Sequence, residues 1–256
     1  MRGVDISHYQ KGLTIRQLKD AGYDFAIIKL TEGIEIVDKS AFDFYREAYE
    51  LGFPVGCYCY SHATTPKQAA AEAGHLLDVL NGFPMPCGVF LDVEEPKQLG
   101  LSHDAMLEVL DTWCNGIAQH GYVPGIYGSE GNLWAKVHPD LLMEGSLVWV
   151  AKWSQTPPNV PCDIWQTSDS GRVDGYSGTV DTDETRGQRM EGRIRGFEGY
   201  YKPIEYEPPD VASDTGGSKD PVELASDLLL AYLRSGEFSE SFSEYVKNSL
   251  TMMERR

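Results

Sequence analysis

The sequence lacks the features that mark membrane and nucleic-acid-binding proteins. No stretch approaches the roughly 18 consecutive apolar residues that a membrane-spanning helix needs. The N-terminus has no cationic start followed by an apolar run, so we expect a protein without a signal peptide, made and first held in the cytoplasm. Lys and Arg number 22 against 39 Asp and Glu, which gives a formal net charge of −17. Such a charge argues against binding to nucleic acid or to an anionic membrane surface.

Cysteine and histidine show no pattern of a disulfide framework or a metal site. The five cysteines are odd in number and form no C-x-x-C pair, and the six histidines show no metal-ligand spacing. Cys57 and Cys59 lie two apart on a predicted strand, where a disulfide between them would be strained. We therefore expect five reduced, mostly buried thiols, no metal and no cofactor.

The composition indicates a globular protein with a large core. The chain has 256 residues, 41% of them hydrophobic and 11% aromatic, which suits one large domain or a domain of about 200 residues with an appendage. Over residues 1–185, short apolar runs alternate with segments of helical periodicity, such as 41–51, 66–80 and 103–120. The eight predicted strands are 3–6, 24–30, 54–60, 87–93, 123–128, 147–153, 163–166 and 178–181.

This alternation predicts an α/β fold with parallel strands and helices outside them. Eight strands in about 185 residues favour a barrel related to the eight-stranded β/α type but short of some helices. The main alternative is an open, doubly wound sheet, which often carries a glycine-rich dinucleotide loop after its first strand. The segment Ser7-His8-Tyr9-Gln10 stands there instead, so the barrel is the better prediction.

The amino-acid composition changes after residue 185. Residues 186–220 are rich in Pro, Gly, Ser and aromatics, which indicates an irregular connector. Asp220-Pro221-Val222-Glu223 reads as a helix start, and residues 221–256 predict two short amphipathic helices, marginal on their own. We expect them to dock on the barrel, to form a homo-oligomer or to target a cell wall.

The most informative feature is a pair of carboxylates at the end of a buried strand. Cys87-Gly88-Val89-Phe90-Leu91 is apolar and leads into Asp92-Val93-Glu94, where alternation places Asp92 and Glu94 on one face. On the fourth strand of a barrel, that face points inward at the carboxyl-terminal mouth, where active sites lie. Two adjacent acids resist ionising together, which glycoside hydrolysis exploits. The alternative is that both acids face water and cap the next segment.

Polar and aromatic residues also stand at the ends of the other predicted strands. Because these ends meet at one mouth, they provide hydroxyl-binding groups and rings on which sugars stack. Structural roles remain open, since Lys29 could pair with an acid and the aromatics could fill the barrel. The residues are Asp5, Lys29, Glu32, Tyr58, Tyr60, Tyr127, Trp153, Gln166 and Asp181.

Five sequence segments in order resemble glycoside hydrolase family 25, the Chalaropsis-type lysozymes. They are Asp5-x-Ser7-x-x-Gln10, Phe25-Ala26-Ile27-Ile28-Lys29-x-Thr31-Glu32-Gly33, Phe90-Leu91-Asp92-Val93-Glu94, Trp165-Gln166, and Gly171-Arg172-Val173 with Gly178-Thr179-Val180-Asp181. The resemblance covers residues 1–185 and implies a catalytic, TIM-like irregular barrel of five β/α units plus three further strands. It implies hydrolysis of the β-1,4 bond between N-acetylmuramic acid and N-acetylglucosamine in peptidoglycan, without a metal. Many members are bacteriophage endolysins or bacterial autolysins, so the resemblance suggests a phage or prophage lysin that acts on the wall after release.

The same resemblance implies roles for four acids. Glu94 matches the general acid/base, and Asp92 matches the partner carboxylate that steers the substrate's own acetamido nucleophile. Asp5 and Asp181 match two further acids at the site. We expect the charge of Asp92 and the apolar strand to raise the pKa of Glu94. Asp183 stands where many members carry Asn, and we expect it not to touch the proposed acids.

Two other functions remain as alternatives. A glycan-binding protein without turnover could use the same barrel, although all four acids are present. A barrel glycosidase acting on chitin would carry a longer D-x-x-D-x-D-x-E signature, which residues 89–94 do not extend to.

Overall fold

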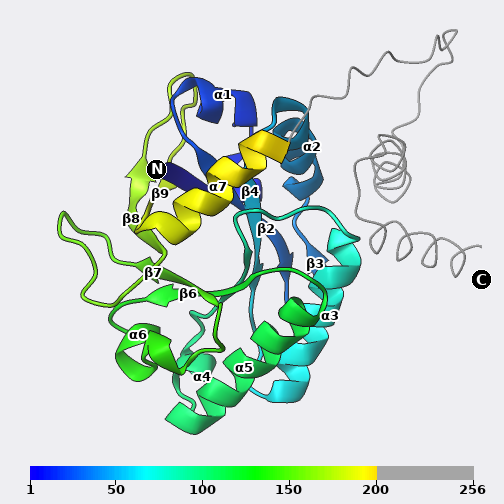
Figure 1. Ribbon diagram of the computed structural model, residues 1–256, viewed down its shortest axis with the longest axis vertical. Helices are drawn as coiled ribbons and strands as arrows, with labels where there is room; N and C mark the ends of the chain where they lie inside the picture. The colour runs from blue at the N-terminus through cyan, green and yellow to red at the C-terminus, as the bar shows by residue number, and fades with distance from the viewer. Residues whose placement is uncertain (201–256) are drawn as a thin grey trace, which may run out of the picture. The chain divides into compact units, whose positions relative to one another are not determined.

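Eight strands close into a barrel in the computed structural model, which describes residues 1–200 (Figure 1). Around the barrel their order is β1, β2, β4, β5, β6, β7, β8 and β9, and β9 returns to pair with β1. Each of the eight overlaps a predicted strand, although β9 shares only Val180 and Asp181 with its prediction and β8 extends beyond its predicted end, and an additional short strand, β3, pairs with the end of β2. Their bounds are β1 Arg2–Ile6, β2 Phe25–Glu32, β3 Ile36–Val37, β4 Val55–Tyr60, β5 Val89–Asp92, β6 Pro124–Ser129, β7 Leu147–Ala151, β8 Ile164–Gly171 and β9 Val180–Thr185.

Strand direction sets which residues reach the mouth. From β1 through β2 and β4 to β8 every neighbouring pair is parallel, whereas β9 runs antiparallel to both β8 and β1. The first five barrel strands are each followed by a helix that leads to the next parallel strand, whereas β7 and β8 are followed directly by strands and β9 is antiparallel, so five β/α units plus three further strands are confirmed. We call the end at which the parallel strands finish the mouth, and the opposite end the base.

The helices begin and end at local sequence signals. The side chain of Thr65 caps the start of the helix that begins at Pro66 by accepting a hydrogen bond from the backbone N–H of Gln68. Asn81 adopts the left-handed conformation that ends the same helix. Ser102 caps the longest helix as its sequence predicts. The helical bounds are η1 His8–Gln10, α1 Ile15–Asp20, α2 Ala41–Leu51, α3 Pro66–Leu80, α4 Pro96–Leu99, α5 His103–Gln119, α6 Leu133–Lys136, η2 Pro139–Leu141 and α7 Gln188–Tyr200. Among the described residues, none of these helices has the length and apolar content to cross a membrane.

Alternation along the strands divides the core into two parts. One cluster fills the barrel interior and includes Phe25, Ile27, Phe90, Leu147 and Trp149. The other lies between the outer faces of the strands and the helices, with its strand residues at the alternate positions. The five thiols are free and all but Cys162 are buried, as predicted.

Helix α7 corrects the predicted connector. The sequence prediction had an irregular segment from residue 186, but residues 188–200 are helical, and Met190 and Ile194 are fully buried in the interior cluster. Their spacing of four residues places both on one face of the helix. Charged residues surround this narrow apolar face, so the amphipathic pattern is hard to see in the sequence. The N-terminal ammonium of Met1 lies 3.7 Å from Glu191, so α7 (yellow in Figure 1) lies beside the chain start.

Contacts of α7 place it across the base of the barrel. Arg193 donates to the carbonyl of Pro86, just before β5, and Arg189 donates to the carbonyl of Ser146, just before β7. The helix therefore plugs the end opposite the mouth. The predicted helices within 221–256, and the connector beyond residue 200, lie outside the described residues.

A glycine inside the barrel should be sensitive to enlargement. Gly125 on β6 pairs with Phe90 on β5, and a Cβ at Gly125 would overlap the Phe90 ring. We expect Gly125→Ala to lower the free energy of unfolding by about 1–3 kcal/mol, because the packed interior must shift. Gly131→Ala is the matched control, since nothing lies within 4 Å of its Cβ position. Denaturant unfolding measures both, and equal stabilities would contradict this packing.

Candidate active site

The predicted acids come together at the mouth of the barrel. Strand β5 buries Phe90 inward and ends at Asp92, whose carboxyl shares that face two residues later. Val93 packs outward in the other cluster, so Glu94 returns to the mouth. Asp5 ends the inward face of β1. Asp92 and Glu94 thus share a face as predicted, and Asp5 lies within electrostatic reach of both.

Asp92 is a buried carboxyl with few neighbouring groups that stabilise its negative charge. It is 6% exposed, and its Oδ1 has no hydrogen-bond partner. Burial raises the pKa of Asp92 well above its usual value, and the charges of Glu94 and Asp5 raise it further, whereas Lys29 lowers it. Asp92 and Glu94 therefore cannot both ionise readily.

Glu94 is the acid of this pair that solvent reaches. Its side chain is exposed, yet the surrounding walls remove enough water to raise its pKa, and the Tyr127 hydroxyl offsets part of that shift. The sequence argument attributed the raised pKa of Glu94 partly to Asp92. Desolvation is instead its main cause, and the stronger effect of the pair falls on the more buried Asp92.

Gln166 on β8 connects four groups at the mouth. Its Nε2 donates to Asp5 Oδ2 at 2.8 Å and to Asp181 Oδ2 at 3.5 Å. Its Oε1 accepts from the Tyr127 hydroxyl at 3.0 Å and from Trp153 Nε1 at 2.9 Å. Gln166 is 1% exposed, so it orients its neighbours more than it meets solvent.

Asp181 reaches the mouth for a different reason from the one predicted. It was expected at the end of the last strand, but it lies at the start of β9, which runs in the opposite direction. The start of an antiparallel strand lies beside the ends of its parallel neighbours, so the placement at the mouth stands. Burial, with help from Asp169 and Glu94, raises the pKa of Asp181 to about 6.

Asp183 was excluded from the site by sequence reasoning, and the structure corrects this. It is 1% exposed, accepts a hydrogen bond from Trp149 Nε1 at 2.8 Å, and lies close enough to the Asp5 carboxyl for each to act on the pKa of the other. Burial first, and then the charge of Asp5, raise the pKa of Asp183 well above its usual value. Side chains alternate along a strand, so Asp183 shares the inward face of Asp181, and this pattern could have identified it in the sequence.

Lys29 belongs to a charged chain along one side of the mouth. Its Nζ lies 2.6 Å from Glu32 Oε2 and 5.1 Å from the ring centre of Tyr60. His62 follows, with Nε2 3.5 Å from Glu32 and Nδ1 2.6 Å from Glu95. Glu95 caps α4 and pairs with His62 and Lys97 instead of the acid pair. Lys29 is thus paired with an acid and also acts on the pKa of Asp92.

The aromatic residues divide into interior packing and exposed surface. Tyr127 is buried and packs on Trp149, and Tyr58 is half-buried with its ring edge toward the same Trp149. Tyr60 is half-buried, whereas Trp153, two residues beyond β7, is 60% exposed. Trp153 is therefore a ring on which a sugar face can stack, and Tyr58 and Tyr127 mainly fill the barrel.

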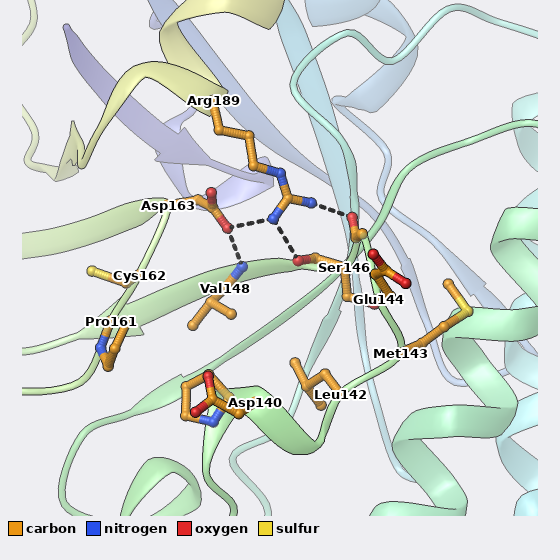
Figure 2. Close-up of a pocket in the computed structure, with 12 residues that line it drawn as sticks. Asp140, Leu142, Met143, Glu144, Ser146, Val148, Pro161, Cys162, Asp163 and Arg189 are labelled. Carbon is orange, nitrogen blue, oxygen red and sulfur yellow. Dashed lines mark hydrogen bonds and ion pairs between the residues drawn. The ribbon is translucent and has the colours of Figure 1, made fainter.

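A cavity at the other end of the barrel is separate from this site. Figure 2 shows its lining from the segments before β7 and β8, together with Arg189 of α7. Arg189 pairs with Asp163 at 3.5 Å and donates to the carbonyls of Ser146 and Gly145. Within residues 1–200, no group of three or more histidine, cysteine or carboxylate side chains is arranged to hold a metal ion.

Comparison with known proteins agrees with this arrangement. The autolytic lysozyme of Clostridium acetobutylicum is 30% identical over 186 residues, which cover 72% of this chain but only 55% of that protein. Lysozyme M1 of Streptomyces globisporus is 29% identical over 212 residues, covering 73% of this chain and 68% of the relative. The crystal structure of the lysozyme from Streptomyces coelicolor superposes with a TM-score of 0.67 at 27% identity, covering 77% of this chain and 98% of that one.

The sequence profile of glycosyl hydrolases family 25 matches residues 4–176, about two thirds of the chain. This stretch contains Asp5, Asp92 and Glu94, and the eight-stranded barrel agrees with the fold of the S. coelicolor enzyme. The chain therefore belongs to the glycosyl hydrolases of family 25.

Proposed function

We propose that this chain is a lysozyme that hydrolyses the β-1,4 bond between N-acetylmuramic acid and N-acetylglucosamine in bacterial peptidoglycan. The observation that carries the proposal is the pair of a buried Asp92 and a solvent-accessible Glu94, both with raised pKa, at the mouth. Family membership supports a glycosidic substrate, and the names of the two relatives support the wall polymer in particular.

In this proposal Glu94 is the general acid. Asp92 and Glu94 together hold a proton at mildly acidic pH, because the charge of each disfavours ionisation of the other. Only Glu94 is open to solvent, so it is the group placed to protonate the leaving glycosidic oxygen. Lys29 offsets part of the rise in the pKa of Asp92, and in this proposal Asp92 orients the acetamido group of the substrate. Asp5 and Asp181, held by Gln166, complete the acidic wall.

Replacing the proposed acid should abolish turnover. We expect Glu94→Gln to lower kcat by about 10²–10⁴-fold, because the amide keeps the shape but has no transferable proton. Digestion of purified, O-deacetylated Gram-positive peptidoglycan, with new reducing ends at N-acetylmuramic acid read by mass spectrometry after borohydride reduction, measures this loss.

Glu95→Gln is the matched control for that experiment. Glu95 is adjacent but contacts His62 and Lys97 instead of the acid pair, so its loss should change the rate by only a few-fold. Near-wild-type digestion by Glu94→Gln would refute the assignment. If the wild-type protein is pulled down by the wall but creates no reducing ends, the chain is a glycan-binding protein on the same barrel.

Trp153 should contribute to substrate binding through its ring. We expect Trp153→Ala to raise KM by about fivefold with a smaller change in kcat, because an exposed stacking surface is lost. Trp153→Phe separates the two roles of this side chain, since Phe keeps a ring but cannot donate to Gln166. If Trp153→Phe is as impaired as Trp153→Ala, the hydrogen bond matters and stacking does not.

We further propose that the catalytic unit needs α7 and that residues 221–256 form a separate two-helix segment. A chain ending at residue 200 keeps Met190 and Ile194 in the barrel interior, whereas one ending at residue 185 exposes that interior at the base. We expect the first to stay folded and active on purified peptidoglycan, and the second to unfold at low denaturant. Equal stability of the two would contradict the role of α7.

The same truncation tests the use of the tail. Loss of activity on whole cells alone would support wall targeting, and a smaller mass in sedimentation would support a homo-oligomer. Synthesis in the cytoplasm and action on the wall after release, as in a phage or prophage lysin, complete the proposal.

A further inference from the structure

We propose that Asp183 is a positioning residue that stays protonated at the working pH and donates its proton to Asp5 in a hydrogen bond. The role in turnover rests on the proposed function, whereas the shared proton can be measured without it.

Strand register brings the two carboxyls together. On the antiparallel β1–β9 pair, Asp5 lies opposite Asp181 and Gly3 lies opposite Asp183. Asp5 and Asp183 are therefore diagonal neighbours on the inward face, within reach of each other across the ladder. Gly3 has no side chain to separate them, and the Phe25 ring occupies the space beneath.

A count of donors shows that the pair needs a proton. Asp183 Oδ1 accepts from Trp149 Nε1, but the buried Oδ2 has no donor facing it. Asp5 Oδ2 accepts from Gln166 Nε2, and the carboxyl of Asp5 lies close enough to that of Asp183 for each to act on the pKa of the other. Two charged carboxylates in contact would leave buried oxygens without hydrogen-bond donors, which is unfavourable. A single proton between them turns the same contact into a hydrogen bond.

The proton belongs on Asp183. Asp183 is 1% exposed and Asp5 is 8% exposed, so charge is disfavoured more strongly on Asp183. The contact between them raises the pKa of Asp183 and lowers that of Asp5, although burial raises the pKa of both. Asp5, nearer the mouth, is then the ionised partner, held on one side by Gln166 and on the other by Asp183.

The surroundings reinforce this assignment. Negative groups face the pair from β9 through Asp181, from β5 through Asp92 and from the following segment through Glu94. Tyr58 and Tyr127 present phenols whose pKa is raised well above the usual value by burial, so they stay neutral. Lys29 on β2 is the cation that acts on Asp92, and it is already paired with Glu32. Among residues 1–200, no cation acts on Asp183 to stabilise a further negative charge there.

This arrangement gives the site an alkaline limit. While the proton is present, Asp5 keeps one charge and one orientation. Once pH rises through the folded-state pKa of the pair, two charges come into contact inside the barrel and the geometry around Gln166 is lost. Because both folded pKa values are raised, this part of the stability is present at low pH and declines as pH rises.

The test is Asp183→Asn in the full chain. The amide of Asn donates to Asp5 and its carbonyl accepts from Trp149, but it has no proton to lose. We expect an alkaline limb of kcat/KM that moves to higher pH by about one unit or more. We also expect the melting temperature of this variant to fall less than that of the wild type as pH rises from 5 to 9. Asp163→Asn is the matched control, a buried carboxyl at the base, and should leave the shape of both profiles unchanged.

A second measurement reads the proton in the wild-type protein. With aspartate carboxyls labelled with ¹³C, the Asp183 resonance should have the chemical shift of a protonated acid at neutral pH and titrate over the range of the alkaline limb. A resonance typical of an ionised carboxylate at neutral pH would overturn the proposal. So would identical pH profiles for wild type and Asp183→Asn. If the chain proves inactive on peptidoglycan, the resonance and the melting profile still decide the matter, and only the proposed function fails.

Discussion

Desolvation of carboxyl groups is the constraint on which the mouth of this barrel depends. Asp5, Asp92 and Asp183 are buried, Asp181 is partly buried and Glu94 is open to solvent, and the pKa of all five is raised primarily by loss of water. Neutral donors compensate several of these oxygens: the amide of Gln166, the indole of Trp149 and the hydroxyl of Tyr127. Neutral donors stabilise some negative charge without cancelling it, so the site retains acids that can hold protons near neutral pH.

Burying this polar cluster is unfavourable, and apolar packing on the same strands offsets that loss of stability. On several strands the inward face begins apolar at the base and becomes polar at the mouth, as in Ile27 before Lys29, Phe90 before Asp92 and Ile164 before Gln166. One barrel thus has a packed lower half, completed by α7, and a charged upper half. Buried acids gather at the mouth, where chemistry is expected, which is the usual location of such violations of the burial rules.

Much of this arrangement could be predicted from sequence because it follows from periodicity. The eight strands, the five β/α units and the shared face of Asp92 and Glu94 all follow from alternation and helical spacing. Asp181 was located at the mouth, but strand direction, which depends on long-range pairing, was not predicted. Asp183 was missed because its contact with Asp5 joins segments nearly 180 residues apart. The helix carrying Met190 and Ile194 was missed because charged residues surround a narrow apolar face.

Because β9 closes the barrel and α7 closes its base, the barrel can be completed only late in translation. Strand β1 leaves the ribosome first, yet one of its two neighbours is β9, and the interior it faces is completed only by Met190 and Ile194. Translation adds about 5–20 residues per second, so the first strands wait on the order of ten seconds or more for these partners. During that time β9 and α7 do not yet cover the apolar inner faces of β2 and β5. The polypeptide therefore completes its acidic mouth and its apolar interior together, at the end of translation of the barrel, and an incomplete chain has neither.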